Sequence, residues 1–567
     1  MKTLKRKFSL VLAVMMMLAM VPLVTSCTAG GGAGGLIELT IYSQLANFAG
    51  VQSGWAGQVF EEKFGVKINI INEMDGTFAT RMATGNLGDI VIFGSDGNQY
   101  QQAVAQGMLL DWEQDNLLQE HGAYIYENMP FALQKNRDME IANDTIYGFG
   151  FDVAGSAEDH QTHIYYPYLR WDLYQQLGKP AINTLEDFIP VLRDMKALEP
   201  VNELGQQTWG VSSFPDWDGD MVMMVKATAA LYGWEEFGIG LYHVVTQEFE
   251  DALKPGGQYL RMLKFYNTLH QMGLFDPDSM TQTFDDAATK YRNGTSFWNI
   301  FTFVAEGYNM PENLEAGRML ACVPAADQTN LAEGLNVYGG TRVWSIGSRT
   351  VYPELAMQII NWLCTPEGVL TYNYGPQGVT WDYDEEGNTY LTEVGLLSQD
   401  DNRTVIVFNG VEQAYQDGQF QHNNTTWTLD AVNPDSASGE TFNWRFWDST
   451  ILNREVAPIE QSWRDWAGGV TTADDFLRNE GKVAVSIGTP FTLGRREAEL
   501  EMTWEQVKGV VTSGSWRAIY AGSDQEFDSI VADMIAEANA YGYARCVEWI
   551  LERAEARREA ENIILNN

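Results

Sequence analysis

The residues with the clearest catalytic potential lie in an acidic segment, F-P-D-W-D-G-D, at positions 214–220. Its carboxylates Asp216, Asp218 and Asp220 alternate with Trp217 and a glycine. Hydrolysis of a glycosidic bond needs two carboxyl groups that face the bond at a defined separation. Proline, glycine and aspartate are also the residues that build turns, where carboxylates accept hydrogen bonds from the backbone. The pattern leaves two alternatives, a hydrolytic pair and a structural loop.

Other catalytic and metal-binding patterns give little support to an enzyme. The sequence has no G-x-S-x-G nucleophile motif, no HExxH and no CxxC pair. His160 and His163 form H-Q-T-H without cysteine or acidic ligands at a metal spacing, so we expect no zinc site. The D-x-D-x-x-G spacing at 382–387 shares the opening of a calcium loop, but we interpret it as a hairpin turn. We expect no cofactor, no metal and no catalytic residue.

The aromatic side chains are numerous enough to provide stacking surfaces for a ligand. They make up 12% of the chain and include 18 tryptophans. Indole and phenol rings combine a flat apolar face with a polar edge, which suits stacking on a ligand. A large core that contains strands also takes up tryptophan, and we assign about half of these residues to it.

The chain begins with the pattern of an export signal. A basic start, residues 2–7, precedes the apolar run 8–23, which is too short for a stable membrane span. The next residues, V-T-S-C, resemble the bacterial lipobox, in which the cysteine becomes the lipidated first residue of the mature protein. A glycine-rich spacer, 28–35, follows. We therefore expect a signal peptide over 1–26, palmitate-type lipidation of Cys27, and anchoring on the extracellular side of the cell membrane.

Charge and cysteine content exclude some functions. The formal net charge of −40 is spread along the chain, and such a surface repels nucleic acid and anionic lipid. We therefore exclude nucleic-acid binding. Cys322, Cys364 and Cys546 lie in apolar contexts, so we expect buried free thiols, with a Cys322–Cys364 bridge as an alternative.

Strands and helices alternate in the first part of the body. Residues 36–43, 66–71 and 90–93 are predicted strands, and residues 58–65 and 101–107 are predicted helices. This alternation predicts a parallel α/β sheet with right-handed crossovers. In such sheets ligands bind beyond the carboxyl ends of the strands. Those ends carry the polar residues Gln44, Asn47, Ser95 and Asp96.

A series of ordered segments is informative when the segments are taken together. They are L-T-I-Y-S-Q (39–44), F-E-E-K-F-G-V-K-I-N-I (60–70), A-T-G-N-L-G-D-I-V-I-F-G-S (83–95), I-Y-Y-P-Y-L-R-W-D-L (164–173), N-G-T-S-F-W (293–298), Y-G-G-T-R-V-W-S-I (338–346) and Y-G-P-Q-G (374–378). The series resembles the extracellular solute-binding proteins of bacterial ABC importers, in their carbohydrate-binding group. The resemblance covers about residues 36–390, and the longer chain is similar to the large lipoprotein branch.

The resemblance implies an α/β fold of two lobes joined by hinge strands, the type II periplasmic-binding-protein-like arrangement, with an extended and mostly helical C-terminal portion. The N-terminal lobe would comprise residues 36–152 plus 340–385, and the C-terminal lobe residues 153–339 plus 386–567. A ligand held between the lobes would stabilise the closed form, which the transporter permease recognises. The implied partners are an oligosaccharide, ABC permease subunits and the membrane through the lipid anchor. We expect a monomer that is not an enzyme.

Sugar recognition needs aromatic faces for the rings and Asp, Asn, Gln or Arg for the hydroxyls. Candidates come from segment ends that would face the cleft. Trp298 follows N-G-T-S-F, and the glycines of Y-G-G-T-R-V-W would let the backbone approach a ligand. The predicted ligand-binding residues are Gln44, Asn47, Ser95, Asp96, Asp152, Trp217, Asp218, Trp298, Arg342, Trp344 and Trp381.

Three alternatives remain open at this point. The same fold can serve a peptide or another small solute, and the aromatic content is what favours sugar. A secreted glycan-active hydrolase would use the carboxylates of residues 214–220. A structural or adhesive surface lipoprotein has no specific pattern in its favour.

Overall fold

The computed structural model describes residues 35–566 apart from residues 75, 152, 155–164, 334–336, 424–428, 430 and 454. The predicted signal peptide and the lipidation site Cys27 lie outside the described residues. Within the described part of the chain, no helix has both the length and the apolar character needed to cross a bilayer. The chain divides into two units, Met1–Ile37 and Glu38–Asn567, and the contacts described below lie in the larger one.

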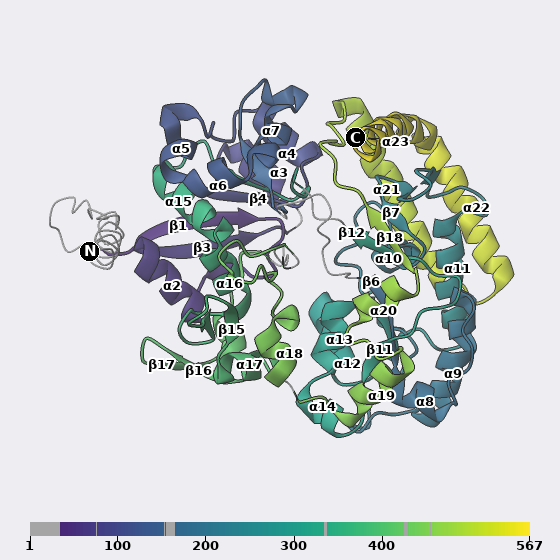
Figure 1. Cartoon of the computed structure of the whole chain (residues 1–567). Coiled ribbons are helices and arrows are strands. Elements are labelled where there is room, and N and C mark those ends of the chain that lie inside the picture. Colours follow the sequence, from purple (N-terminus) through teal and green to yellow (C-terminus); the bar gives the residue numbers. More distant parts are fainter. Residues whose placement is uncertain are drawn as a thin grey trace. The chain divides into compact units, whose positions relative to one another are not determined.

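We call the part of the molecule that packs around a six-stranded sheet the first region (Figure 1). The strands of this sheet follow the order β2-β3-β1-β4-β13-β5. β1 and β4 run parallel, as predicted. β13 runs antiparallel to β4 and to β5, because the chain reaches it from the second region and not through a strand–helix–strand crossover. The all-parallel prediction therefore holds for only part of the sheet. The strands are β1 (Ile37–Ser43), β2 (Gly50–Val51), β3 (Val66–Asn72), β4 (Ile90–Phe93), β5 (Gly148–Gly150) and β13 (Val343–Ile346).

The strand β4 shows why this sheet is buried on both faces. Its four residues, I-V-I-F, are all buried, and continuous apolar runs are typical of strands covered on both sides. On one face Val91 and Phe93 join a core cluster with Tyr42 of β1 and with Tyr100 and Ala103 of α4. The surrounding helices include α2 (Gly54–Phe64), α3 (Thr77–Thr84), α4 (Asn98–Ala105), α5 (Leu117–His121), α15 (Pro353–Cys364) and α16 (Pro366–Tyr374).

Residues well beyond 386 also pack on the first region. Trp55 of α2 stacks on Tyr415 at 5.6 Å between ring centroids and donates its indole N–H to the Tyr415 carbonyl oxygen at 2.9 Å. Phe420 lies edge-on against Trp55 at 5.4 Å and against Phe60 at 5.3 Å. The predicted boundary at residue 386 assigns Tyr415 and Phe420 to the C-terminal lobe, whereas in the structure both residues pack on the first region. The chain completes the core of the first region before it returns to the second region.

The second region is built on a three-stranded sheet in which β6 (Tyr165–Arg170) lies between β10 (Trp298–Phe301) and β11 (Leu320–Cys322), antiparallel to both. Its core cluster joins residues from 166–325 with residues from 459–554. β12 (Asn330–Glu333) pairs in parallel with β18 (Val483–Ser486). Two stretches far apart in sequence therefore share one core.

Three helices end the chain, and they are the yellow helices of Figure 1. α21 (Ala498–Ile519) contacts α11 (Gln258–Gln271) and α22 (Asp524–Tyr541), and α23 (Tyr543–Leu565) contacts α21. Gly542 separates α22 from α23 with φ of 104°, a left-handed conformation that glycine adopts without strain. The mostly helical C-terminal portion is confirmed.

Candidate functional site

The acidic loop 214–220 is held in place by its own carboxylates. Asp216 accepts a hydrogen bond from the backbone N–H of Phe284 at 2.7 Å. Asp218 accepts one from the Met223 N–H at 2.9 Å and a second from the Trp516 indole at 2.7 Å. Burial raises the pKa of Asp218, and these two hydrogen bonds oppose the rise. The predicted ligand-binding residue Asp218 therefore has both carboxylate oxygens bonded within the protein.

In this loop the aspartates hold the backbone in place, and Trp217 lies between them. Asp220 accepts a hydrogen bond from the Trp504 indole at 3.0 Å, so α21 supplies indole donors to two of the three carboxylates. Trp217 lies between the anchors and is half-buried. Of the two alternatives left by the sequence, the geometry favours a structural loop, because each carboxylate already accepts a hydrogen bond from another part of the protein.

Trp217 stands in a group of rings that we call the aromatic platform, defined as Trp217, Phe284 and Phe303. Trp217 stacks on Phe284 with 4.6 Å between centroids and 27° between planes. Phe303 lies 6.1 Å from Trp217 and is 40% exposed. The buried rings of Phe214 and Phe301 support them, at 4.9 Å from Trp217 and 5.2 Å from Phe303. The platform offers partly exposed aromatic faces on a rigid base.

Three neighbouring chain segments bring these rings together. Trp209 pairs in parallel with Ser296, which leads into β10, and Val211 pairs in parallel with Phe275. Beyond the carboxyl ends of these segments stand Trp217 in its loop, Phe303 in the first turn of the helix 302–308, and Phe284 at the start of the helix 284–292. Parallel segments end at one edge of a sheet, and ligands of α/β proteins bind at such edges. The predicted residue Trp217 thus lies at such an edge, together with Phe284 and Phe303, which are absent from the predicted set.

The polar candidates of the first region lie around the ends of β1 and β4. Gln44 accepts a hydrogen bond from the Gly94 N–H at 2.9 Å and donates to the Gln99 side chain at 2.6 Å. Ser95 is exposed and accepts from the Gly97 N–H, and Asn47 is exposed as well. The structure therefore brings Gln44 and Ser95 to one sheet edge.

Asp96, from the same loop, is turned inward. Its side chain is 5% exposed and lies 3.4 Å from Nζ of Lys135, which is 7% exposed. Burial raises the pKa of the Asp96 carboxyl, and the ammonium group of Lys135 opposes that rise. Asp96 thus belongs to a buried ion pair in this structure.

Three predicted tryptophans are fully buried. Trp298 lies between Phe188 and Phe265, at 5.8 and 5.9 Å between centroids. Trp344 packs on Phe151 at 4.5 Å. Trp381 donates its indole N–H to the Gly375 carbonyl oxygen at 2.8 Å. No face of these rings is exposed to a ligand in this structure, so their stacking roles stay predictions.

Arg342 is half-buried just before β13. Burial raises the pKa of Tyr165, Glu333 adds to the rise, and Arg342 opposes it, so the three residues share one electrostatic neighbourhood. Asp152 lies outside the described residues.

The nearby glycines serve close backbone packing. A Cβ at Gly150 would meet the Gly340 carbonyl oxygen at 1.9 Å, and one at Gly339 would meet the Gly150 carbonyl oxygen at 2.3 Å. The structure gives these glycines a purpose other than the predicted approach of a ligand.

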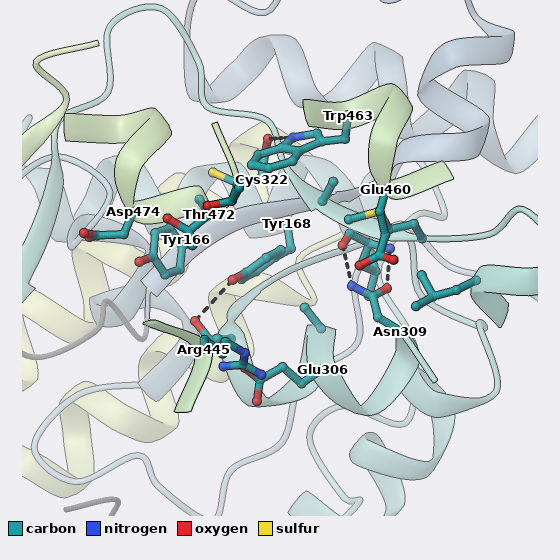
Figure 2. A pocket seen from close by; sticks show the side chains of 18 of the residues that line it. Tyr166, Tyr168, Glu306, Asn309, Cys322, Arg445, Glu460, Trp463, Thr472 and Asp474 are labelled. Carbon is teal, nitrogen blue, oxygen red and sulfur yellow. Dashed lines mark hydrogen bonds and ion pairs between the residues drawn. The ribbon is translucent and has the colours of Figure 1, made fainter. Parts of the chain in front are cut away.

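A cavity of about 240 Å³ lies beside α13 (Thr302–Tyr308) in the second region. Figure 2 shows Tyr168 near its centre, with Trp463 on one side and the Arg445–Glu306 ion pair on the opposite side. The Arg445–Glu306 distance is 2.7 Å, and Tyr168 bonds to Thr302 at 3.3 Å. Aromatic walls and polar edges thus occur together here.

The segment 382–393 forms the hairpin of β14 (Trp381–Tyr383) and β15 (Thr389–Leu391). The turn interpretation overlooked that Glu393 stands twelfth from Asp382, where a calcium loop carries its closing glutamate. Asp384 accepts from the Asn388 N–H at 2.7 Å. Within the described residues, no three His, Cys, Asp or Glu side chains are placed to share a metal ion. The side chains as placed here do not fit a calcium site.

The cysteines agree with the sequence analysis. Cys322, Cys364 and Cys546 are buried and free, so no Cys322–Cys364 bridge forms. Burial raises the pKa of all three thiols, to about 11 for Cys546.

Comparison of the backbone with solved structures identifies the fold. An extracellular solute-binding protein of Bifidobacterium longum subsp. infantis is 15% identical, with 93% of this chain and 100% of that chain covered and a TM-score of 0.54. The ABC-transporter substrate-binding protein FusA of Streptococcus pneumoniae, in complex with kestose, is 14% identical over 93% and 99%, with a TM-score of 0.58. This chain has the fold of an extracellular solute-binding protein.

A third structure with this fold is the N-glycan transport solute-binding protein NgtS of S. pneumoniae in complex with Man1GlcNAc. It is 15% identical, covers 92% of this chain and 99% of that chain, and has a TM-score of 0.52. The predicted fold class, α/β and two-lobed, is confirmed. No protein-family model matches the sequence, and no curated protein matches it.

The residues that sequence reasoning missed had a readable signal. Phe303 stands two residues beyond the end of β10, where a ring leaves the strand, whereas Trp298 is its first residue. Phe284 begins α12 (Phe284–Arg292) directly after the N-cap Thr283. Position relative to the strand or helix end, and not residue type, distinguishes the platform rings from the core rings.

Proposed function

We propose that this chain is a membrane-tethered extracellular solute-binding lipoprotein. In this proposal it captures a carbohydrate, an oligosaccharide, in a cleft between its two lobes and delivers it to the permease of an ABC transporter. Capture is reversible, and a hinge motion whose equilibrium the ligand shifts couples binding to delivery.

The aromatic platform is the observation that carries the proposal. Trp217 and Phe284 stack with 4.6 Å between their centroids, and Phe303 beside them is 40% exposed. Pyranose rings have apolar C–H faces that lie on such rings, while their hydroxyls need polar partners. Gln44, Asn47, Ser95 and Arg342 are the predicted polar residues that are not buried, and we assign those hydroxyls to them.

The solved structures with this fold add support from their own ligands. FusA was solved with kestose and NgtS with Man1GlcNAc, both of which are oligosaccharides. The signal-like N-terminus and the V-T-S-C sequence support the lipid anchor at Cys27 and the extracellular location.

The hydrolase alternative is less well supported than binding. A retaining or inverting pair needs two carboxyl groups that face the same bond. Asp216, Asp218 and Asp220 instead accept hydrogen bonds from a backbone N–H of α12 and from two indoles of α21. We therefore propose a binding protein without catalysis.

A thermal-shift screen of the protein from Thr28 onward, against neutral plant and microbial oligosaccharides, tests the proposal. A ligand that binds only the folded state raises the melting midpoint, and at a hundred times Kd the gain is about 2.7 kcal/mol. We expect a selective shift and recovery of the unaltered sugar. Cleaved sugar would support the hydrolase, and no shift with any sugar would move the ligand to a peptide or another solute.

Anchoring is tested separately with Cys27→Ala. Loss of the lipidated cysteine should move the protein from the membrane fraction to the medium, because a glycine-rich spacer alone gives no membrane affinity. Radiolabelled palmitate should label the wild type and not the variant. A variant that stays in the membrane fraction would contradict the lipoprotein proposal.

A further inference from the structure

The cavity beside α13 has the construction of a binding site and not of a packing defect. Protein interiors contain few voids larger than a water molecule. This one has a volume of about 240 Å³ and is lined by apolar rings together with charged groups. Tyr166, Tyr168 and Trp463, all buried, contribute rings to its wall.

The polar groups of the wall are of the kind that binds hydroxyls. Carboxylates accept hydrogen bonds from hydroxyls, and guanidinium and amide groups donate to them. Asn309 and the Glu306–Arg445 ion pair line the cavity, and the ion pair stays accessible at 43% and 39% side-chain exposure. Figure 2 shows the ion pair on the side opposite Trp463. Asn309 lies beside Glu460 and exchanges two hydrogen bonds with the backbone of Leu320, at 2.8 Å each. A ligand here would meet the ring of Trp463 on one side and the charged groups of the ion pair on the other.

Charge selects among hydroxylated ligands. Four carboxylates and two guanidinium groups line the cavity. Glu306 is paired with Arg445 and Asp474 with Arg478, which leaves Asp400 and Glu460 against Arg464, and the whole chain has a net charge of −40. An anionic sugar such as a uronate would be repelled by the excess of negative charge. A neutral sugar meets no such penalty. The lining charges are Glu306, Asp400, Glu460, Asp474, Arg445 and Arg464.

Size restricts the occupant to one ring. Pockets for drug-sized ligands have volumes of roughly 300–1,000 Å³, and this cavity is smaller, at about 240 Å³. It can accommodate a single sugar unit but not a chain of them.

The helix α13 connects the cavity to the aromatic platform. Glu306 lines the cavity and Phe303 belongs to the platform. Residues three apart on a helix are neighbours on its surface, about 5–6 Å apart at Cβ. The two sites therefore lie on adjacent faces of the same short helix.

We propose that this cavity is a second saccharide site, which takes one neutral sugar unit of the same oligosaccharide whose other units stack on the platform. The inference rests on the proposed function and adds to it: the ligand is a neutral oligosaccharide, not a uronate, and it binds with one unit inserted beside Tyr168.

The test compares two substitutions of Thr471, an exposed residue that lines the cavity. Thr471→Trp should obstruct the cavity, while Thr471→Ala leaves it open. Thr246→Trp places the same indole on an exposed turn that does not line the cavity and serves as the matched control. Equal melting midpoints of the four proteins would show that none of the substitutions disturbs the fold.

Isothermal titration calorimetry with malto-, fructo- and N-acetylglucosamine oligosaccharides, from disaccharide to pentasaccharide, then measures Kd against length. In the wild type we expect one added unit to lower Kd about tenfold, the gain of one further stacked ring. Thr471→Ala and Thr246→Trp should keep this step, and Thr471→Trp should lose it while shorter sugars bind normally. Oligogalacturonates of equal length should show no step.

A step that persists in Thr471→Trp, an equal step with oligogalacturonates, or no step in the wild type would overturn the inference and leave the proposed function intact. Failure of every sugar to bind the wild type would instead overturn the proposed function, and the second site with it.

Discussion

The loop 214–220 and the strands β10, β13 and β14 use tryptophan in opposite ways. In the loop, Trp217 is half-buried between aspartates that anchor the backbone. In the strands, Trp298, Trp344 and Trp381 are fully buried. The strand residues lie at positions covered by helices or neighbouring rings, whereas the loop begins beyond the strand end. We expect the loop to control affinity and the strands to control stability.

The largest expected effect is on stability. Trp298→Ala removes a buried indole from between Phe188 and Phe265 and should lower the free energy of unfolding by about 3–5 kcal/mol. Denaturant titration followed by circular dichroism measures the loss. Trp298→Phe, which keeps a ring, should lose less. If Trp298→Ala kept its stability but lost glycan binding, the distinction between the loop 214–220 and the strands would fail. The stacking role predicted for Trp298 from the sequence would then stand.

The second effect is on affinity. Trp217→Ala removes the ring that stacks on Phe284 and should weaken oligosaccharide binding by about 2 kcal/mol, a factor of roughly 30 in Kd. Its melting midpoint should change little, because the anchors Asp216, Asp218 and Asp220 remain. Calorimetry with the sugar found in the thermal-shift screen measures the change. Unaltered affinity would remove Trp217 from the site.

A buried histidine beside Trp344 should make the stability of the protein depend on pH. His422 is fully buried against Trp344 and Phe420, and neither ring nitrogen has a hydrogen-bond partner among the described residues. Burial lowers the pKa of His422 from 6.5 to about 3. Because the folded pKa lies below the unfolded one, the unfolded state binds the extra proton, and stability falls as the pH drops below 6.5 towards 3.

The expected size of this term is about 2 kcal/mol of unfolding free energy lost between pH 7 and pH 5. His422→Phe keeps the aromatic packing and removes the titration, so its stability should fall less over the same range. Denaturant titrations of both proteins at the two pH values measure the difference. An equal loss of unfolding free energy in the two proteins would mean that His422 is not buried as a neutral ring.

The smallest effect concerns the anchors of the loop. Trp516→Phe leaves Oδ2 of Asp218 without its indole donor and should cost about 1–2 kcal/mol of stability. Since Asp218 adjoins Trp217, we also expect Kd to rise several-fold. Trp504→Phe removes the corresponding bond to Asp220, which is farther along the chain from Trp217, and is the matched control. Equal effects on Kd would mean that Asp218 has no special part in positioning the ring.

Much of the fold could be predicted from the sequence, because local patterns determined it. β1, β3 and β4 have the period and boundaries expected of buried strands, and the C-terminal portion is mostly helical as expected. The antiparallel entry of β13 and the packing of Tyr415 on Trp55 could not be predicted in this way. Both depend on chain segments far apart in sequence, about which periodicity contains no information.

The candidate site could be predicted only in part. The rule that ligands bind beyond strand ends pointed to the neighbourhood of Gln44, and the structure places Gln44 and Ser95 at one sheet edge. The resemblance to cleft-facing segments, however, selected Trp298 and Trp344, which the structure buries, and the predicted set omits Phe284 and Phe303. Asp96 illustrates the same limit, since only the position of Lys135 reveals that its carboxylate is paired inside the first region.

The pairing of distant segments has a consequence for the order of folding. The first core needs Tyr415 and Phe420 against α2, and the second needs β18 beside β12 together with α21. A chain that emerges N-terminus first keeps the first core open until Tyr415 and Phe420 are available, and the second core until α21 is available. Contacts across such separations form slowly. An export route that delivers the chain unfolded, and holds it so until it is complete, would suit this architecture better than one that lets each half fold as it appears.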